Sequence, residues 1–214
     1  MSRYKTLIFD LDGTLIDTKP GILKSLEHTF DTLAITDRPD PSLFLGPPLP
    51  DSFRRFCGMD KQETDEAVRI FRRRYSESEL FNAEVFEGIP ELLGRLKNCG
   101  HRLAVATCKV ERYAEAVLKH FGLDGYFDVI GGSVENRTQK RDVIAHVISQ
   151  LGETDSSRVL MIGDRDNDVS GAMSAGIKCM GVLWGYGSGR ELALTGAEFI
   201  ARTPDHAAEM LLAQ

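Results

Sequence analysis

The chain of 214 residues is 42% hydrophobic and 27% charged, with a formal net charge of −6 and an isoelectric point near 5.4. This composition is typical of a globular protein with one large domain or a core and a small insert, and the acidic balance argues against nucleic acid or an anionic membrane surface as the main partner. No apolar stretch is long enough to cross a bilayer, and the N-terminus leaves no room for a signal peptide, so we expect a cytoplasmic protein.

The first predicted strand is short and apolar and ends in acids. Leu7–Phe9 forms a run that is typical of a buried parallel strand, and Asp10, Asp12 and Gly13 follow it closely. Because side chains alternate along a strand, Asp10 and Asp12 can point the same way, at the strand end where open α/β sheets bind ligands. The alternative is an Asp-Gly turn whose acids only cap backbone groups.

The stretch that follows shows helical periodicity alone. Apolar residues recur at helical spacing over residues 22–33 and again over 68–75, where Asp60 marks a possible helix start. Five prolines between residues 35 and 50 predict a loop with short turns. Residues 17–84 are therefore predicted to form a small all-helical insert.

From residue 85 onward, predicted strands alternate with predicted helices. The strands are expected at residues 103–107, 127–130, 159–162, 177–182 and 199–200. The helices are expected at residues 89–96, 114–121, 143–151 and 169–173 and after Pro204. Such alternation predicts an α/β fold with a parallel sheet and right-handed crossovers.

A second apolar run also ends in acids. Val159–Ile162 is followed by Asp164, Asp166 and Asp168. Two buried strands that end in carboxylates bring like charges together, which is costly unless a proton or a cation offsets them. Hard oxygen ligands suit Mg²⁺, so the sequence predicts a magnesium site, with Asp166 expected to be an exposed loop acid.

These residues carry a family resemblance. Asp10–Leu15 resembles the first motif of the haloacid dehalogenase superfamily in its phosphatase form, and Asp164 with Asp168 four residues later resembles the acidic fourth motif. Thr107 matches the second motif, and Lys140 matches the third by order, although an arginine follows it where a proline is commonest. The motifs span nearly the whole chain.

The resemblance implies an architecture and two central roles. A Rossmann-like core would comprise residues 1–16 and 85–214, and the helical cap would comprise residues 17–84. Asp10 is the expected nucleophile, which forms an aspartyl-phosphate, and Asp12 is the expected general acid and base. The implied metal ligands are Asp10, Asp12 through its backbone carbonyl, Asp164 and Asp168.

Groups that hold the phosphoryl oxygens are expected after the predicted strand at 103–107. The hydroxyl of Thr107, together with backbone N–H groups near Cys108 and Lys109, could bind a phosphoryl oxygen, although a threonine that ends a strand can also simply cap the next turn. Two lysines could balance the acids. Lys140 fits the motif order, whereas Lys109 could instead reach the substrate phosphate.

The stretch Phe44–Leu49 resembles the phosphoglycolate phosphatase-like branch of the superfamily, some members of which are nucleotidases. The resemblance implies a Mg²⁺-dependent phosphatase that acts on a small phosphorylated metabolite, as a monomer or a small homo-oligomer. Arg54 and Arg55 could bind a carboxylate or a second phosphate of that substrate, or could form a solvated helix face.

Two other functions remain open at this point. A phosphomutase of the β-phosphoglucomutase kind uses the same core motifs and transfers the phosphoryl group to a sugar phosphate. A receiver-type signalling module, in which a phosphorylated aspartate switches a binding surface, is the non-enzymatic alternative. Such modules are usually shorter, lack a cap and carry the acceptor aspartate on a middle strand.

Overall fold

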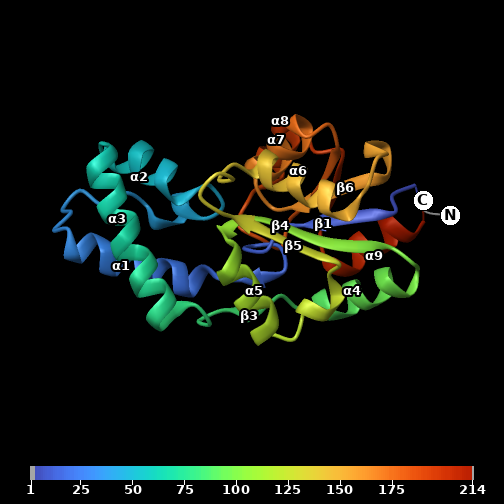
Figure 1. Cartoon of the computed structure of the whole chain (residues 1–214), viewed down its shortest axis with the longest axis horizontal. Helices are drawn as coiled ribbons and strands as arrows, with labels where there is room; N and C mark the ends of the chain where they lie inside the picture. The colour runs from blue at the N-terminus through green and yellow to red at the C-terminus, as the bar shows by residue number, and fades with distance from the viewer. Residues whose placement is uncertain (1–2, 214) are drawn as a thin grey trace.

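The structure of the chain, a computed structural model that describes residues 3–213, is built on a six-stranded parallel sheet (Figure 1). The strands lie in the order β5-β4-β1-β6-β7-β8, so β1 is central and lies between β4 and β6. Their bounds are β1 Thr6–Phe9, β4 Arg102–Val110, β5 Val129–Ser133, β6 Val159–Gly163, β7 Lys178–Val182 and β8 Phe199–Ala201. The sheet confirms the predicted α/β fold class.

Helices cover both faces of this sheet (Figure 1). One face carries α6 (Lys140–Leu151), α7 (Asp166–Ser174) and α8 (Gly189–Thr195), and the other carries α4 (Ile89–Asn98), α5 (Glu111–His120) and α9 (Pro204–Leu212). Side chains along β1 alternate between the two helical layers. Leu7 and Phe9 are buried with α4, α5 and α9, whereas Ile8 is buried with α6 and α7. A strand buried on both faces is mostly apolar, as Leu7–Phe9 of β1 are.

A helical segment lies beyond one end of the sheet, at the left of Figure 1. It contains α1 (Lys19–Thr32), the 3₁₀ helix η1 (Pro41–Phe44), α2 (Leu49–Cys57), α3 (Lys61–Arg74) and the π-helix η2 (Tyr75–Glu79). Two short strands, β2 (Ile16–Asp17) and β3 (Glu84–Val85), pair antiparallel where the chain enters and leaves it. We call residues 17–84 the helical insert, and its assignment as a separate cap domain remains our interpretation.

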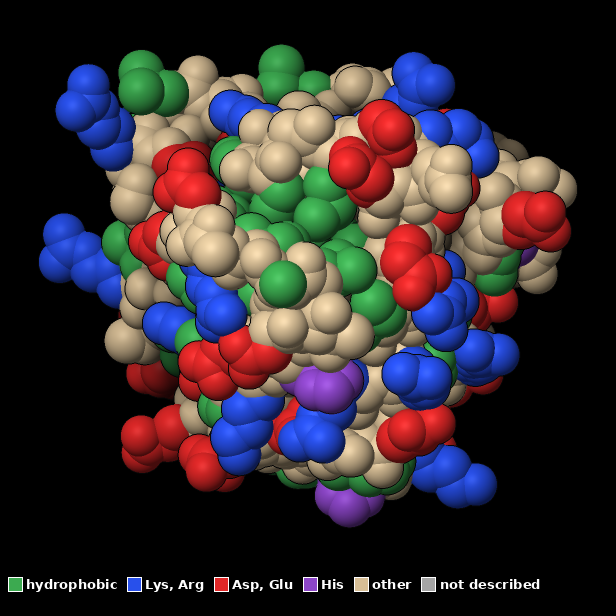
Figure 2. Space-filling view, turned by 90° about the vertical axis from the view of Figure 1, so that its left-hand side faces the viewer, with side chains coloured by type: hydrophobic (Ala, Val, Ile, Leu, Met, Phe, Trp, Pro, Cys, Tyr) green, Lys and Arg blue, Asp and Glu red, His purple; other side chains and the backbone are tan. Residues whose placement is uncertain are grey.

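The helical insert has an aromatic centre of its own. Phe30 of α1, Phe44 of η1 and Phe53 of α2 meet edge to face, with ring centroids 5.1 to 6.4 Å apart. Such contacts add to the stabilisation that area burial alone provides. Seen from the insert's end of the molecule, hydrophobic side chains show among charged ones of both signs (Figure 2).

Two helices differ from the sequence prediction. α2 begins at Leu49, inside the region predicted to be a loop, because Pro50 occupies the first turn, where a helix does not need the missing N–H. α8 was not predicted, since it is only seven residues long. No helix within residues 3–213 is both long and apolar enough to span a membrane.

Two strands extend further than predicted. β4 continues past Thr107 to Val110, and β5 starts at Val129 and runs through Gly131 and Gly132 to Ser133, beyond the predicted end at residue 130. At Gly131 an added Cβ would lie 2.5 Å from a methyl carbon of Val147 in α6. The glycine therefore allows a helix to pack directly on the strand, and does not end it.

Candidate active site

Three buried carboxylates meet at the carboxyl end of the central strands. Asp10 follows β1, Asp164 follows β6, and Asp168 lies in the first turn of α7. β1 and β6 are neighbours, with Phe9 opposite Ile162, so both strands end at the same edge. The three side chains can each offer an oxygen atom within 4.8 Å of the others. Sequence reasoning proposed all three, and the structure brings them together.

Lys140 is the cation inside this acidic cluster. Its ammonium lies 2.6 Å from Oδ1 of Asp10 and 2.7 Å from Oδ1 of Asp168, and it donates to the carbonyl of Ala106 at 2.9 Å. The side chain is only 2% exposed. Burial alone would lower its pKa, but the two carboxylates raise that pKa well above the ordinary value. Lys140 is therefore a fixed positive charge.

One ammonium does not balance three carboxylates. Burial, together with the charges of Asp168 and Asp12, raises the pKa of Asp10 to about 7, against the opposing effect of Lys140. Burial and the charges of Asp168 and Asp10 raise the pKa of Asp164 to about 8. With all three acids ionised, two negative charges would remain, and a divalent cation offsets that excess. These oxygen ligands fit Mg²⁺.

Hydrogen bonds orient the acids that follow β6. Asp164 accepts from the hydroxyl of Thr14 at 3.1 Å and from the backbone N–H of Tyr186 at 2.7 Å. Asp168 accepts from the backbone N–H of Arg165 at 3.0 Å. Asp166 is exposed and outside the cluster, as expected for an acid without a role there.

Asp12 has separate partners beside the cluster. Lys109 donates to both its carboxylate oxygens, at 2.8 and 3.1 Å, and Thr18 donates to Oδ1 at 2.6 Å. The ammonium of Lys109 also lies 4.8 Å from the ring centroid of Tyr75, a residue of the helical insert. Burial would lower the pKa of Lys109, but Asp12 raises it above the ordinary value. The two lysines thus hold different carboxylates.

The segment after residue 106 lies against the same acids. Thr107 is buried, and its hydroxyl accepts from the backbone N–H of Lys109 at 3.2 Å. The Cys108 sulfur accepts from the side-chain amide of Asn167 at 3.3 Å. Burial raises the pKa of the Cys108 thiol to about 11, so the sulfur stays protonated at neutral pH and is a poor nucleophile.

A cavity of about 200 Å³ joins these groups to the helical insert. Asp10, Asp12, Thr107 and Lys109 line it from the sheet side. Its other walls are largely apolar and aromatic, formed by Ile22, Phe44, Leu49, Phe71, Tyr75 and Tyr113. A phosphate at the acids would therefore place the rest of its molecule against the insert.

The cavity's arginines differ from those expected. Arg54 lines the cavity, but its guanidinium pairs with Asp51. Arg55 does not belong to the lining, because α2 directs its guanidinium over the ring of Phe56, 5.2 Å from the centroid. Arg72 of α3 is exposed and also lines the cavity, and no carboxylate within residues 3–213 lies within salt-bridge distance of it.

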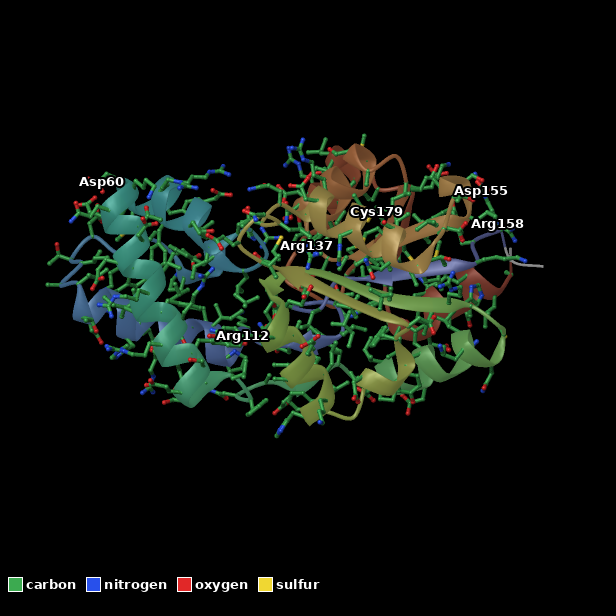
Figure 3. The ribbon with its side chains drawn as sticks, in the orientation of Figure 1. Asp60, Arg112, Arg137, Asp155, Arg158 and Cys179 are labelled. Carbon is green, nitrogen blue, oxygen red and sulfur yellow. The ribbon has the colours of Figure 1, made fainter. Side chains whose placement is uncertain are left out.

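A partly buried ion pair fixes the loop between β5 and α6. Arg137, which points toward the junction of sheet and insert in Figure 3, pairs with Glu111 and donates to the carbonyl of Gly132 at 3.1 Å. Glu111 also accepts from the N–H of Gly132 at 3.0 Å. These bonds fix a loop that contributes Thr138 and Gln139 to the cavity.

Comparison with known proteins gives consistent matches. Residues 7–182 match the family model described as haloacid dehalogenase-like hydrolase. The chain is 41% identical to a 5'-nucleotidase of Pseudomonas aeruginosa over 195 residues. The aligned region covers 89% of this chain and 87% of that protein. It is 38% identical to the tyrosine-protein kinase PtkA of Mycobacterium tuberculosis over 202 residues. The aligned region covers 92% of this chain and 65% of that protein.

A solved structure matches over the whole length. The crystal structure of a predicted phosphatase from Clostridium acetobutylicum superposes with a TM-score of 0.94 at 36% identity and covers 100% of both chains. Further relatives are named pyrophosphatase and phosphoglycolate phosphatase. The relatives thus carry the names of different activities and substrates.

Proposed function

Since the chain belongs to the haloacid dehalogenase-like hydrolases, we propose that it is a Mg²⁺-dependent phosphatase that hydrolyses a small phosphomonoester through an aspartyl-phosphate. The observation that carries the proposal is the buried cluster of Asp10, Asp164, Asp168 and Lys140, of which Asp10 lines the cavity. The cluster joins a nucleophile, a place for a divalent cation and a fixed positive charge, which are the parts that phosphoryl transfer requires.

In this proposal Asp10 attacks phosphorus, and Asp12 handles the proton. As the carboxylate of Asp10 bonds to phosphorus, the ester P–O bond breaks, and the leaving oxygen takes a proton from Asp12. Asp12 then removes a proton from water, which attacks the aspartyl-phosphate, releases phosphate and restores Asp10. Thr18 and Lys109 hold the Asp12 carboxylate, which supports its position as the acid and base.

The remaining groups stabilise the charge that develops on phosphorus. Asp10, Asp164 and Asp168, with the carbonyl of Asp12, would hold Mg²⁺, which supplies electrostatic stabilisation to the phosphoryl oxygens when bound. Lys140 contributes a fixed cation beside Asp10. Thr107 and the backbone around Cys108 are proposed to donate to a phosphoryl oxygen.

Two substrate classes fit different walls of the cavity. Phosphoglycolate carries a carboxylate that Arg72 could bind, in line with the branch that the sequence resembles. A nucleoside 5'-monophosphate carries a planar base, which favours the aromatic walls formed by Phe71, Tyr75 and Tyr113, and one relative is named a 5'-nucleotidase. We propose phosphoglycolate-like substrates first and nucleotides second. A cytoplasmic monomer or small homo-oligomer remains our expectation.

The test is release of phosphate from a panel that includes phosphoglycolate, nucleoside 5'-monophosphates and sugar phosphates, with Mg²⁺ or with EDTA. We expect turnover that stops with EDTA and returns with Mg²⁺, and none in Asp10→Asn. Phosphate release by folded Asp10→Asn at the wild-type rate would contradict the proposal. Transfer from a bisphosphate to a sugar phosphate, without hydrolysis, would instead identify a phosphomutase.

A further inference from the structure

The loop between β7 and α8, residues 183–188, runs beside the candidate site. The indole N–H of Trp184 donates to the carbonyl of Thr14 at 2.9 Å, and the backbone N–H of Tyr186 donates to Oδ2 of Asp164 at 2.7 Å. The loop is therefore fixed both to the turn after β1 and to one of the proposed metal ligands.

Two glycines let this loop pass close to the site. A Cβ at Gly185 would lie 2.1 Å from the carbonyl oxygen of Gly13, and one at Gly187 would lie 1.8 Å from that of Asp164. Any side chain at these two positions would therefore push the loop away. Tyr186 stands between them, and its position is set by the backbone on both sides.

The hydroxyl of Tyr186 reaches the start of the helical insert. It accepts from the backbone N–H groups of Thr18 and Lys19, at 2.9 and 3.0 Å, and donates to Oδ1 of Asp17 at 3.0 Å. The first N–H groups of a helix lack partners within the helix and need a cap. Thr18, at the N-cap position of α1, does not cap α1 with its side chain, because its hydroxyl bonds to Asp12. Tyr186 supplies this acceptor from another part of the chain, and it shares the N–H of Lys19 with Oδ1 of Asp17, 3.1 Å away.

We infer that Tyr186 is a positioning residue for the hydrolysis proposed above, on which this inference rests. Its amide fixes Asp164, and its hydroxyl fixes the first turn of α1. That turn carries Thr18, whose hydroxyl orients the carboxylate of Asp12. Tyr186 thus sets the proposed acid and base relative to the proposed metal site, without touching the reacting atoms.

The variant Tyr186→Phe removes the hydroxyl and keeps the ring and the amide. The variant loses all three hydrogen bonds of the hydroxyl, and we expect kcat to fall about tenfold, while KM and the Mg²⁺ concentration for half-maximal activity stay within twofold. Tyr126→Phe is the matched control, because Tyr126 lies in the 3₁₀ helix Asp124–Tyr126 and outside the cavity lining, and its kcat should not change.

A double-mutant cycle tests the route through Thr18. If Tyr186 acts by placing Thr18, then Thr18→Val and Tyr186→Phe are not additive, and the double variant loses no more kcat than the more damaged single variant. Independent effects that multiply would overturn the inference. A loss of kcat accompanied by an equal loss of Mg²⁺ affinity and a lower melting temperature would also overturn it, since that pattern belongs to general structural damage.

Hydrogen exchange supplies a readout that needs no activity. In Tyr186→Phe the amides of Thr18 and Lys19 should exchange at least tenfold faster than in the wild type, while amides in β6 keep their protection. Unchanged exchange at Thr18 and Lys19 would refute the inference, whatever the enzyme assays show. A wild-type protein without phosphatase activity would instead count against the proposed function.

Discussion

Arg72 is the residue whose position most changes the expectation for substrate choice. Of the cations that line the cavity, Lys109 pairs with Asp12 and Arg54 pairs with Asp51, whereas Arg72 has no such partner within residues 3–213. An arginine without a carboxylate partner can bind an anionic group on the substrate with little competition.

We therefore predict that Arg72→Ala lowers kcat/KM for phosphoglycolate by about tenfold, the scale of one charge-assisted hydrogen bond, and lowers that for an ester with an uncharged leaving group by less than twofold. Steady-state kinetics on both substrates check this. Arg73→Ala, at an adjacent exposed arginine outside the cavity lining, is the matched control. Equal losses on both substrates, or none, would remove Arg72 from substrate selection.

Single residues differ in how well the sequence predicts their place. The acids after β1 and β6 could be predicted to meet, because both follow apolar strands that end at one edge of a parallel sheet. The partner of Lys109 could not, since nothing in the local sequence links it to Asp12. Tyr186 was missed for the same reason. Its sequence signal is a tyrosine between two glycines. That pattern indicates a role only once the structure places the loop beside Asp164.

At the scale of elements, α3 begins as its sequence predicts. Asp60 accepts from the backbone N–H of Glu63 at 2.9 Å, and the Glu63 carboxylate accepts from the N–H of Asp60 at 2.9 Å. This reciprocal pair is a capping box and satisfies two backbone donors at the helix start.

Asp60→Ala should therefore lower the free energy of unfolding by about 1 kcal/mol, as the loss of a helix cap does. Chemical denaturation measures it. Asp65→Ala provides the comparison, because Asp65 only forms an exposed ion pair with Lys61, worth about 0.3–0.5 kcal/mol. If both variants lost the same stability, the capping box would have no special contribution.

Elements whose signals are local were predictable, and those decided by packing were not. The sequence pattern located the helices on both faces of the sheet except α8. α2 was hidden by a high proline content, although Pro50 in a first turn is compatible with a helix. The π-helix η2 has no distinct signal in its residues. β5 continues past its predicted end at residue 130, because Gly131 leaves the room that the close approach of Val147 requires.

At the scale of the whole molecule, the acidic cluster links stability to pH and to metal. The pKa values of Asp10 and Asp164, about 7 and about 8, lie above the ordinary value of 3.8. Below pH ~4 both groups are protonated in the folded and the unfolded chain. As pH rises from ~4 to ~8, the unfolded chain loses these protons first, so the metal-free protein loses stability across that range.

Bound Mg²⁺ should offset this loss, because it interacts with the ionised acids. We predict that saturating Mg²⁺ raises the melting temperature more at pH 8 than at pH 5.5, as measured by calorimetry. In Asp164→Asn the difference between the two pH values should shrink, since one of the titrating groups is removed. A metal-induced shift that is equal at both pH values, or larger at pH 5.5, would contradict the account of the cluster.

The central claim is that Asp10 carries the phosphoryl group during turnover. The direct measurement is acid quenching of wild-type protein mixed with excess substrate and Mg²⁺, followed by peptide mass spectrometry to locate any acyl phosphate. We predict a phosphoryl group on the peptide that contains Asp10 and none in Asp10→Asn. Steady release of phosphate with no phosphoryl group on Asp10, or with one bound to another residue, would contradict it.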